Sequence, residues 1–114
     1  MSSKKKYQVV SAGDFKIKPL DTLIIPTNTF LKIEHDELAF FQIEESLYKL
    51  HGIICVEPVI ECEEESRLMI KISKICSQTS RSIENTIHAQ IFGSPEEFSI
   101  RENMVIGNLT LLSL

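Results

Sequence analysis

Acidic side chains are the groups in this sequence best suited to chemistry, and they gather at three places. Asp14 follows a glycine near the N-terminus, Glu44 and Glu45 precede a short apolar stretch, and residues 61–65 hold four glutamates and one cysteine. Such carboxylates can activate water, hold a divalent cation or contact a basic partner. A turn residue at Asp14 and a solvated, self-repelling loop at residues 61–65 are the structural alternatives.

Histidines and cysteines show no comparable grouping. The residues concerned are His35, His51, His88, Cys55, Cys62 and Cys76. The histidines lack ligand spacing and the cysteines contain no C-x-x-C pair, so we predict no metal site. We expect reduced thiols, Cys55 and Cys76 in the core, and an intracellular location in cytoplasm or nucleus. No serine has a His or Asp partner at a recognisable spacing, and no glycine-rich phosphate loop is present.

The elements that must position these groups are predicted to be β-strands. Sixteen isoleucines stand against three alanines, and isoleucine suits a pleated surface whereas alanine favours helix. Short apolar runs separated by turn residues predict strands near residues 6–10, 14–18, 21–26, 29–34, 38–44, 53–60, 67–76, 85–92, 97–100 and 104–112. Residues 44–50 fit a single helical turn or a loop. The Ser-rich segment 77–84 is predicted to be a mobile connection.

The domain organisation follows from the length of 114 residues, which suits one domain. We predict a flexible basic leader over residues 1–6 and a single all-β jelly roll or β-sandwich over residues 7–114. The segment from Ile53 to Ile60 is apolar on both faces, which predicts burial on both sides, within the sandwich or against another subunit. We therefore expect an oligomer.

The charge balance excludes some classes of partner. Twelve basic and sixteen acidic residues give a net charge of −4. Such a chain has no general attraction for nucleic-acid phosphates or anionic lipid, so we expect neither nucleic acid nor membrane as partners. No apolar run approaches the roughly 20 residues needed to cross a bilayer.

Four collinear segments resemble motifs of the dUTPase family. Residues 11–15 (Ser-Ala-Gly-Asp-Phe) resemble its Ala-Gly-Tyr-Asp-Leu motif without the aromatic residue. Residues 43–53 resemble the motif that runs Pro-Arg-Ser-Ser-Leu-Ala and soon reaches His-Gly-Ile. Residues 58–68 lie where the family has Gly-Val-Ile-Asp-Ser-Asp-Tyr-Arg-Gly, and residues 103–109 resemble the closing strand motif. The resemblance covers about residues 12–112 and implies a β jelly roll, usually assembled as a homotrimer with shared active sites.

The resemblance also implies roles for two carboxylates. Asp14 matches the acid that helps to hold magnesium through water, and Glu61 falls on the general-base aspartate. Glutamate is one methylene longer, which displaces the carboxylate by more than the roughly 0.5 Å that a catalytic arrangement tolerates. The Gly-rich C-terminal arm of the family has no counterpart after Leu109. Both positions are therefore interpreted as vestigial.

The nucleotide-binding positions differ more strongly from the family. Glu44 and Glu45 fall where arginine and serine would hold phosphate, which reverses the sign of the site. Glu64 falls on the tyrosine that stacks against the sugar. Ser46 is the one match that remains on the phosphate side. We interpret this nucleotide site as degraded.

We therefore predict a chain that is not an enzyme but a non-catalytic dUTPase-like scaffold, which serves protein interaction or oligomeric structure. We expect it to use no cofactor and to be of viral origin. Glu63, Glu64 and Glu65 are the candidate contacts for a protein partner. One alternative is a divergent dUTP pyrophosphatase that uses magnesium, Asp14, Glu61 and a basic residue of another subunit; Arg67, Arg81 and Arg101 are the candidates. The other is an unrelated oligomeric β-barrel with a structural or assembly role.

Overall fold

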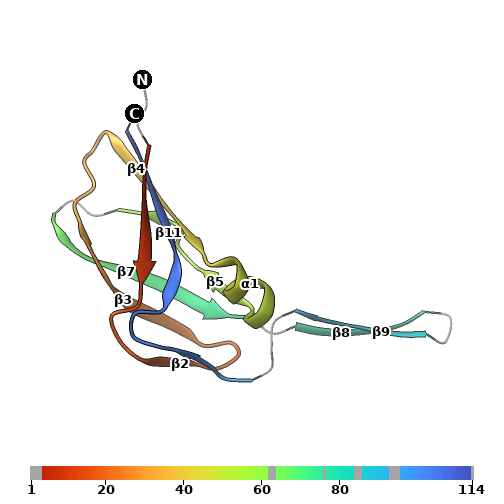
Figure 1. Ribbon diagram of the computed structural model, residues 1–114. Helices are drawn as coiled ribbons and strands as arrows, with labels where there is room; N and C mark the ends of the chain where they lie inside the picture. The colour runs from red at the N-terminus through yellow and green to blue at the C-terminus, as the bar shows by residue number, and fades with distance from the viewer. Residues whose placement is uncertain (1–3, 62–63, 76, 84–85, 93–95, 114) are drawn as a thin grey trace.

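Two antiparallel sheets form the body of the protein in the computed structural model, which describes residues 4–61, 64–75, 77–83, 86–92 and 96–113 (Figure 1). One sheet has the order β1-β11-β4-β6 and the other the order β3-β7-β5. Their bounds are Lys4–Val10 (β1), Val105–Ser113 (β11), Glu37–Ile43 (β4), Val59–Ile60 (β6), Thr22–Leu31 (β3), Ser66–Lys74 (β7) and Ile53–Cys55 (β5). The all-β sandwich predicted from residue choice is confirmed.

Three smaller elements complete the described fold. The short strands β2 (Phe15–Ile17) and β10 (Phe98–Ile100) pair with each other. Strands β8 (Ser77–Ile83) and β9 (Thr86–Phe92) form an antiparallel ribbon that projects away from the sandwich (Figure 1). The helix α1 (Glu45–His51) lies between β4 and β5 in the chain, which settles the choice between a helical turn and a loop in favour of helix.

The core lies between the two sheets and consists mainly of isoleucine and leucine. Alternation along β7 shows why: Leu68, Ile70 and Ile72 are buried, whereas Met69 between them is 47% exposed. The strand thus presents every second side chain to the core. The buried apolar residues are Val9, Ile17, Ile25, Ile33, Ala39, Phe41, Leu47, Ile53, Leu68, Ile70, Ile72, Ile100, Ile106, Leu109 and Leu111.

Buried polar groups in this core have partners. The Thr27 hydroxyl donates to the carbonyl oxygen of Leu68 at 2.8 Å. The Lys74 side chain is 1% exposed, and its Nζ donates to the carbonyl oxygen of His51 at 2.6 Å, the last residue of α1. Because an unpaired polar group is costly to bury, these bonds hold β3 to β7 and α1 to β7.

Two predicted strand boundaries are wrong. Residues 27–28, the gap between the predicted strands 21–26 and 29–34, lie inside the continuous strand β3, whose pairing with β7 shifts register between Pro26 and Phe30. Proline interrupts the hydrogen-bond ladder but keeps an extended backbone, so the result is an irregular strand instead of a turn. The predicted single strand 53–60 is divided into β5 and β6, which belong to different sheets. Val56 and Val59 are 41% and 49% exposed, so this segment is not buried on both faces within the chain.

Two predicted flexible segments are also corrected. Lys4, Lys5 and Lys6 of the expected leader begin β1 and pair with Leu112, Leu111 and Thr110; residues 1–3 lie outside the described part. The expected connection 77–84 contains β8, which pairs with β9 along its whole length. Both segments are strands because their backbones pair with a partner strand. Such pairing leaves no pattern in the local sequence, which is lysine-rich in one segment and Ser-rich in the other.

In the described residues, no helix is long and apolar enough to cross a membrane.

Candidate functional site

The turn between β1 and β2 positions Asp14. Ser11 is fully buried, and its hydroxyl donates to the carbonyl oxygen of Gly13 at 2.7 Å, which shapes the turn. Asp14 itself is exposed, and its Oδ1 accepts a hydrogen bond of 2.7 Å from the backbone N–H of Glu102. The carboxylate therefore ties this turn to the loop that precedes β11, which is the role of a structural turn residue.

A small pocket of about 260 Å³ lies beside this turn. Asp14, Phe15 and Lys16 line one side, and Ser99, Ile100 and Arg101 line the other. Strands β2 and β10 bring the two sides together through the pairs Lys16–Ser99 and Phe15–Ile100. Of the three arginines named for the enzyme alternative, Arg101 is the one that the described structure places next to Asp14. The Arg67 guanidinium donates to the carbonyl oxygen of Thr27 and lies over the Phe30 ring.

The start of α1 positions Glu44, Glu45 and Ser46. Glu44 is the N-cap residue, and its carbonyl oxygen accepts hydrogen bonds from the backbone N–H groups of Leu47 and Tyr48. Its side chain makes no capping hydrogen bond. Glu45 and Ser46 are exposed in the first turn. Helix starts attract anions, but here two glutamates add negative charge at the place where the resemblance expects phosphate.

Glu45 is engaged within the helix. It forms an ion pair with Lys49 one turn later. The hydrogen bond from Lys49 and its positive charge lower the pKa of Glu45, and the reciprocal interaction raises the pKa of Lys49. Both groups are fully ionised at neutral pH, so the negative charge of Glu45 is balanced by its own helix.

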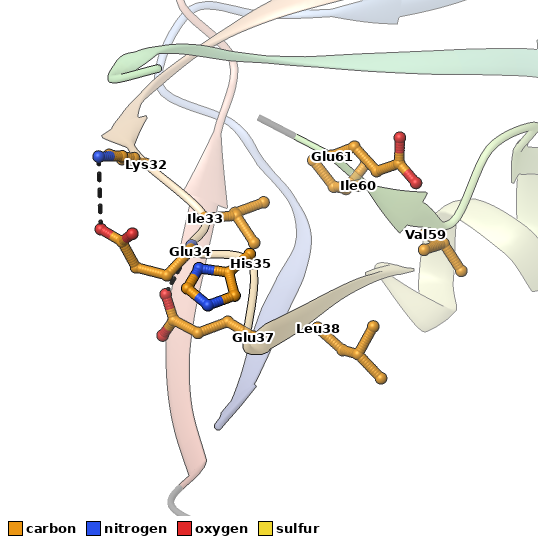
Figure 2. Close-up of a pocket in the computed structure, with 9 residues that line it drawn as sticks. All are labelled: Lys32, Ile33, Glu34, His35, Glu37, Leu38, Val59, Ile60 and Glu61. Atoms are coloured by element: carbon orange, nitrogen blue, oxygen red, sulfur yellow. Dashed lines mark hydrogen bonds and ion pairs between the residues drawn. The ribbon is translucent and has the colours of Figure 1, made fainter. Parts of the chain in front are cut away.

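Glu61 lies in a second, larger pocket of about 510 Å³ (Figure 2). We call this pocket the acidic groove; it is lined by Lys32, Ile33, Glu34, His35, Glu37, Leu38, Val59, Ile60 and Glu61. Figure 2 shows the loop before β4 on one side of the groove and β6 with Glu61 on the other. The pairing of Ala39 with Ile60 and of Phe40 with Val59 brings these two segments together.

The charged groups of the acidic groove are only partly paired. Glu34 lies 3.6 Å from Lys32 Nζ, and a Glu37 carboxylate oxygen accepts a hydrogen bond of 2.9 Å from the Glu34 backbone N–H. Glu61 is exposed. Three carboxylates and one lysine thus surround apolar side chains from both segments, so the groove suits an elongated group with an apolar stem and a positive end.

Sequence reasoning found Glu61 but missed the other half of the groove. Residues 35–37 form the gap between the predicted strands 29–34 and 38–44, although the charges from Lys32 to Glu37 flank the buried Ile33. The alternation of charged residues with the apolar Ile33 was the one feature of the sequence that could have pointed to this half of the groove. It could not show that this loop faces Glu61, because the register of β4 with β6 brings them together.

The remaining acidic candidates lie before β7. Glu64 and Glu65 are exposed, as expected for interaction candidates or for a solvated loop, and Glu63 lies outside the described residues. Asp14, Ser46 and Glu61 lie in three separate places, the β1–β2 turn, α1 and the acidic groove. Among the described hydrogen bonds and ion pairs, none links these three residues.

In the described part of the chain, the residues that could bind a metal ion or act as a reactive thiol do not form a site. No group of three or more His, Cys, Asp or Glu residues there is able to hold a metal ion. Cys55 is a free, half-buried cysteine beside the core, and burial raises its thiol pKa, which disfavours the reactive thiolate. Cys62 and Cys76 lie outside the described residues.

Comparison with known proteins gives matches at the level of structure. No family model matches the sequence, and no curated protein is similar enough in sequence to be matched. A mutant dUTPase from phage phi11 of S. aureus has a TM-score of 0.69 at 14% identity, over 100% of this chain and 91% of that chain. The dUTPase of Staphylococcus bacteriophage 80alpha bound to dUpNHpp has a TM-score of 0.68 at 13% identity, over 100% of this chain and 83% of that chain.

Each of these matches covers 100% of this chain. They bear out the resemblance drawn from four short motifs, and the alternative of an unrelated β-barrel is wrong at the level of fold. Identities this low establish architecture and leave activity to be argued from the site. The chain therefore has the β fold of the dUTPases.

Proposed function

We propose that this protein is a non-catalytic dUTPase-like scaffold that acts through assembly with itself and with a protein partner. The observation that carries the proposal is the start of α1, where Glu44 and Glu45 occupy the positions at which the resemblance expects phosphate-binding residues. A triphosphate brings several negative charges and needs donors and cations around it. Glu44 and Glu45 supply no cation there, and Glu44, the N-cap residue, adds a negative charge that no described ion pair balances.

The state of the other vestigial positions supports the same conclusion. Asp14 uses its carboxylate to hold the Glu102 backbone N–H. Glu61 lies across from Glu34 and Glu37 in a groove whose charge is mostly negative. These residues serve the fold and the surface, and we assign no catalytic step to them.

A homotrimer is the assembly that we propose, on the basis of the dUTPase-type fold and of several exposed apolar side chains. They include Ile24, Val59 and Met69 in strands and Val56 just after β5, each between 41% and 58% exposed. The similarity to phage proteins supports a viral origin, with action inside the host cell. One of them is described as controlling the transfer of virulence genes, which makes a regulatory role for this scaffold a reasonable extension.

The test of this function is turnover of dUTP. Pyrophosphate release is measured with magnesium at high protein concentration, with Glu61→Gln as the blank, and binding of dUpNHpp is measured by calorimetry. We expect no release above the blank and no resolvable heat of binding. The variant Glu44→Arg/Glu45→Ser, which restores the family residues, should bind dUpNHpp more strongly than the wild type does.

The divergent pyrophosphatase is the second candidate. It is favoured by the pocket that places Arg101 beside Asp14, because a cation next to this carboxylate is what the lost phosphate contacts would require. Release of pyrophosphate that is abolished by both Glu61→Gln and Arg101→Gln would establish this candidate and overturn the scaffold. Magnesium would be its only cofactor.

A further inference from the structure

The four-stranded sheet has edges of opposite charge. Strands β1 and β6 are its two outermost strands. Strand β1 begins with Lys4, Lys5 and Lys6, which we call the basic edge, and all three are exposed. At the other side, β6 borders the acidic groove. No described ion pair involves the lysines of the basic edge.

The strand register places both features at the same end of the sheet. Lys5 pairs with Leu111, Leu111 with Ala39, and Ala39 with Ile60, the neighbour of Glu61. Adjacent strands lie about 4.8 Å apart, so three spacings separate the basic edge from β6 by about 14 Å. Glu61 is thus about three strand spacings from the lysines of its own chain, and no described ion pair joins them.

The two edges are complementary in surface as well as in charge. Leu38 and Val59 are 38% and 49% exposed at the groove, and they suit the apolar stems of lysine side chains.

We propose that the basic edge of one copy docks in the acidic groove of a second copy, with Lys4 and Lys6 from one face of β1 and Lys5 from the other reaching Glu34, Glu37 and Glu61. This contact is head to tail, because it joins two different surfaces of the chain. A head-to-tail contact generates a closed ring when its rotation closes, and three copies close the ring of the proposed trimer. The docking contact rests on the self-assembly part of the proposed function and names its surfaces.

Charge reversal tests the contact directly. One variant carries Lys5→Glu and Lys6→Glu, a second carries Glu34→Lys and Glu61→Lys, and a third combines all four changes. The association constant is measured by sedimentation velocity at low and high salt, with circular dichroism to verify folding. Each reversal alone should weaken association at least about tenfold, because attraction between opposite charges is replaced by repulsion between like charges. The combined variant should restore it to within about threefold.

The matched control is Lys16→Glu/Lys18→Glu, which changes the net charge equally at exposed lysines outside the basic edge. It should leave association unchanged. High salt should weaken the wild-type assembly, since the Debye length falls from about 8 Å at 0.15 M to about 3 Å at 1 M. If a reversed variant fails to fold, the neutral pair Lys5→Gln/Lys6→Gln replaces it and should weaken association less strongly.

Failure of the docking contact is distinguishable from failure of the proposed function. An assembly that resists both reversals and salt overturns the docking contact and leaves the oligomeric scaffold intact. A wild-type protein that stays monomeric at all concentrations overturns both the contact and the proposed self-assembly. Loss on reversal without rescue in the combined variant also overturns the pairing of these two edges.

Discussion

Strand β11 and the first turn of α1 both lie in segments that resemble dUTPase motifs, yet they differ in what the resemblance preserves. In β11, Ile106, Gly107 and Leu109 are buried between neighbouring strands. At the start of α1, Leu47 is buried, but Glu44, Glu45 and Ser46 face partly or fully into solvent. Buried residues in both segments fit the resemblance, whereas Glu44 and Glu45 are acidic at positions where the resemblance implies residues that hold phosphate. Architecture and ligand chemistry are thus separable in this chain.

The largest expected effect comes from a substitution in the packed strand β11. A Cβ added at Gly107 would collide with the carbonyl oxygen of Gln42 and the ring of Phe41 on the adjacent strand β4. Backbone cannot move aside as a flexible side chain can, so Gly107→Ala should cost about 3 kcal/mol. Thermal unfolding followed by circular dichroism should show the melting temperature reduced by roughly 10 °C. A loss below about 1 kcal/mol would show that β11 is loosely packed there.

An intermediate effect is expected at Asp14, an exposed residue whose carboxylate is hydrogen-bonded to the backbone of a neighbouring loop. Asp14→Ala removes the acceptor of the Glu102 backbone N–H and should cost about 1 kcal/mol. Asp14→Asn keeps an acceptor oxygen at the same place and should cost less. Chemical denaturation measures both. Equal losses in the two variants would mean that the charge of Asp14, and not this hydrogen bond, stabilises the turn.

The smallest effect concerns the exposed side, where Glu45 pairs with Lys49. Because the folded-state pKa of Glu45 is lowered, its contribution to stability is present above the unfolded pKa of about 4.3 and is lost as pH falls through the folded value. Lys49 has a raised pKa, so its contribution is present below its unfolded pKa and is lost as pH rises through the folded value. Glu45→Gln should therefore lower the melting temperature slightly at pH 7.

That difference should vanish in acid, where wild-type Glu45 is protonated as well. Thermal melts at a series of pH values measure it, and the exposed Glu65→Gln serves as the control for removal of one charge. A difference between Glu45→Gln and wild type that persists unchanged at low pH would show that the helix depends on the side chain and not on its charge.

Most of the architecture was predictable because local residue patterns report the faces of a strand. Isoleucine-rich alternation in β7 predicted its buried residues, and the collinear motifs indicated the fold that the structural comparison bears out. The same reasoning failed where pairing, not side-chain pattern, makes the strand. Lys4–Lys6 and residues 77–83 have no apolar alternation, and their strands exist through partners that are distant in sequence or across a turn.

The sequence by itself determined the β class and the apolar alternation that buries one face of β7, and the resemblance assigned acidic residues to the positions where a phosphate ligand would need cations. Only the tertiary structure decided that Lys32–Glu37 faces Glu61, that residues 53–60 cross from one sheet to the other, and that the basic edge and acidic groove lie at opposite sides of one sheet. The physical reason is register. Residue chemistry is local, whereas the strand pairing that brings distant charges together is set by the whole sheet.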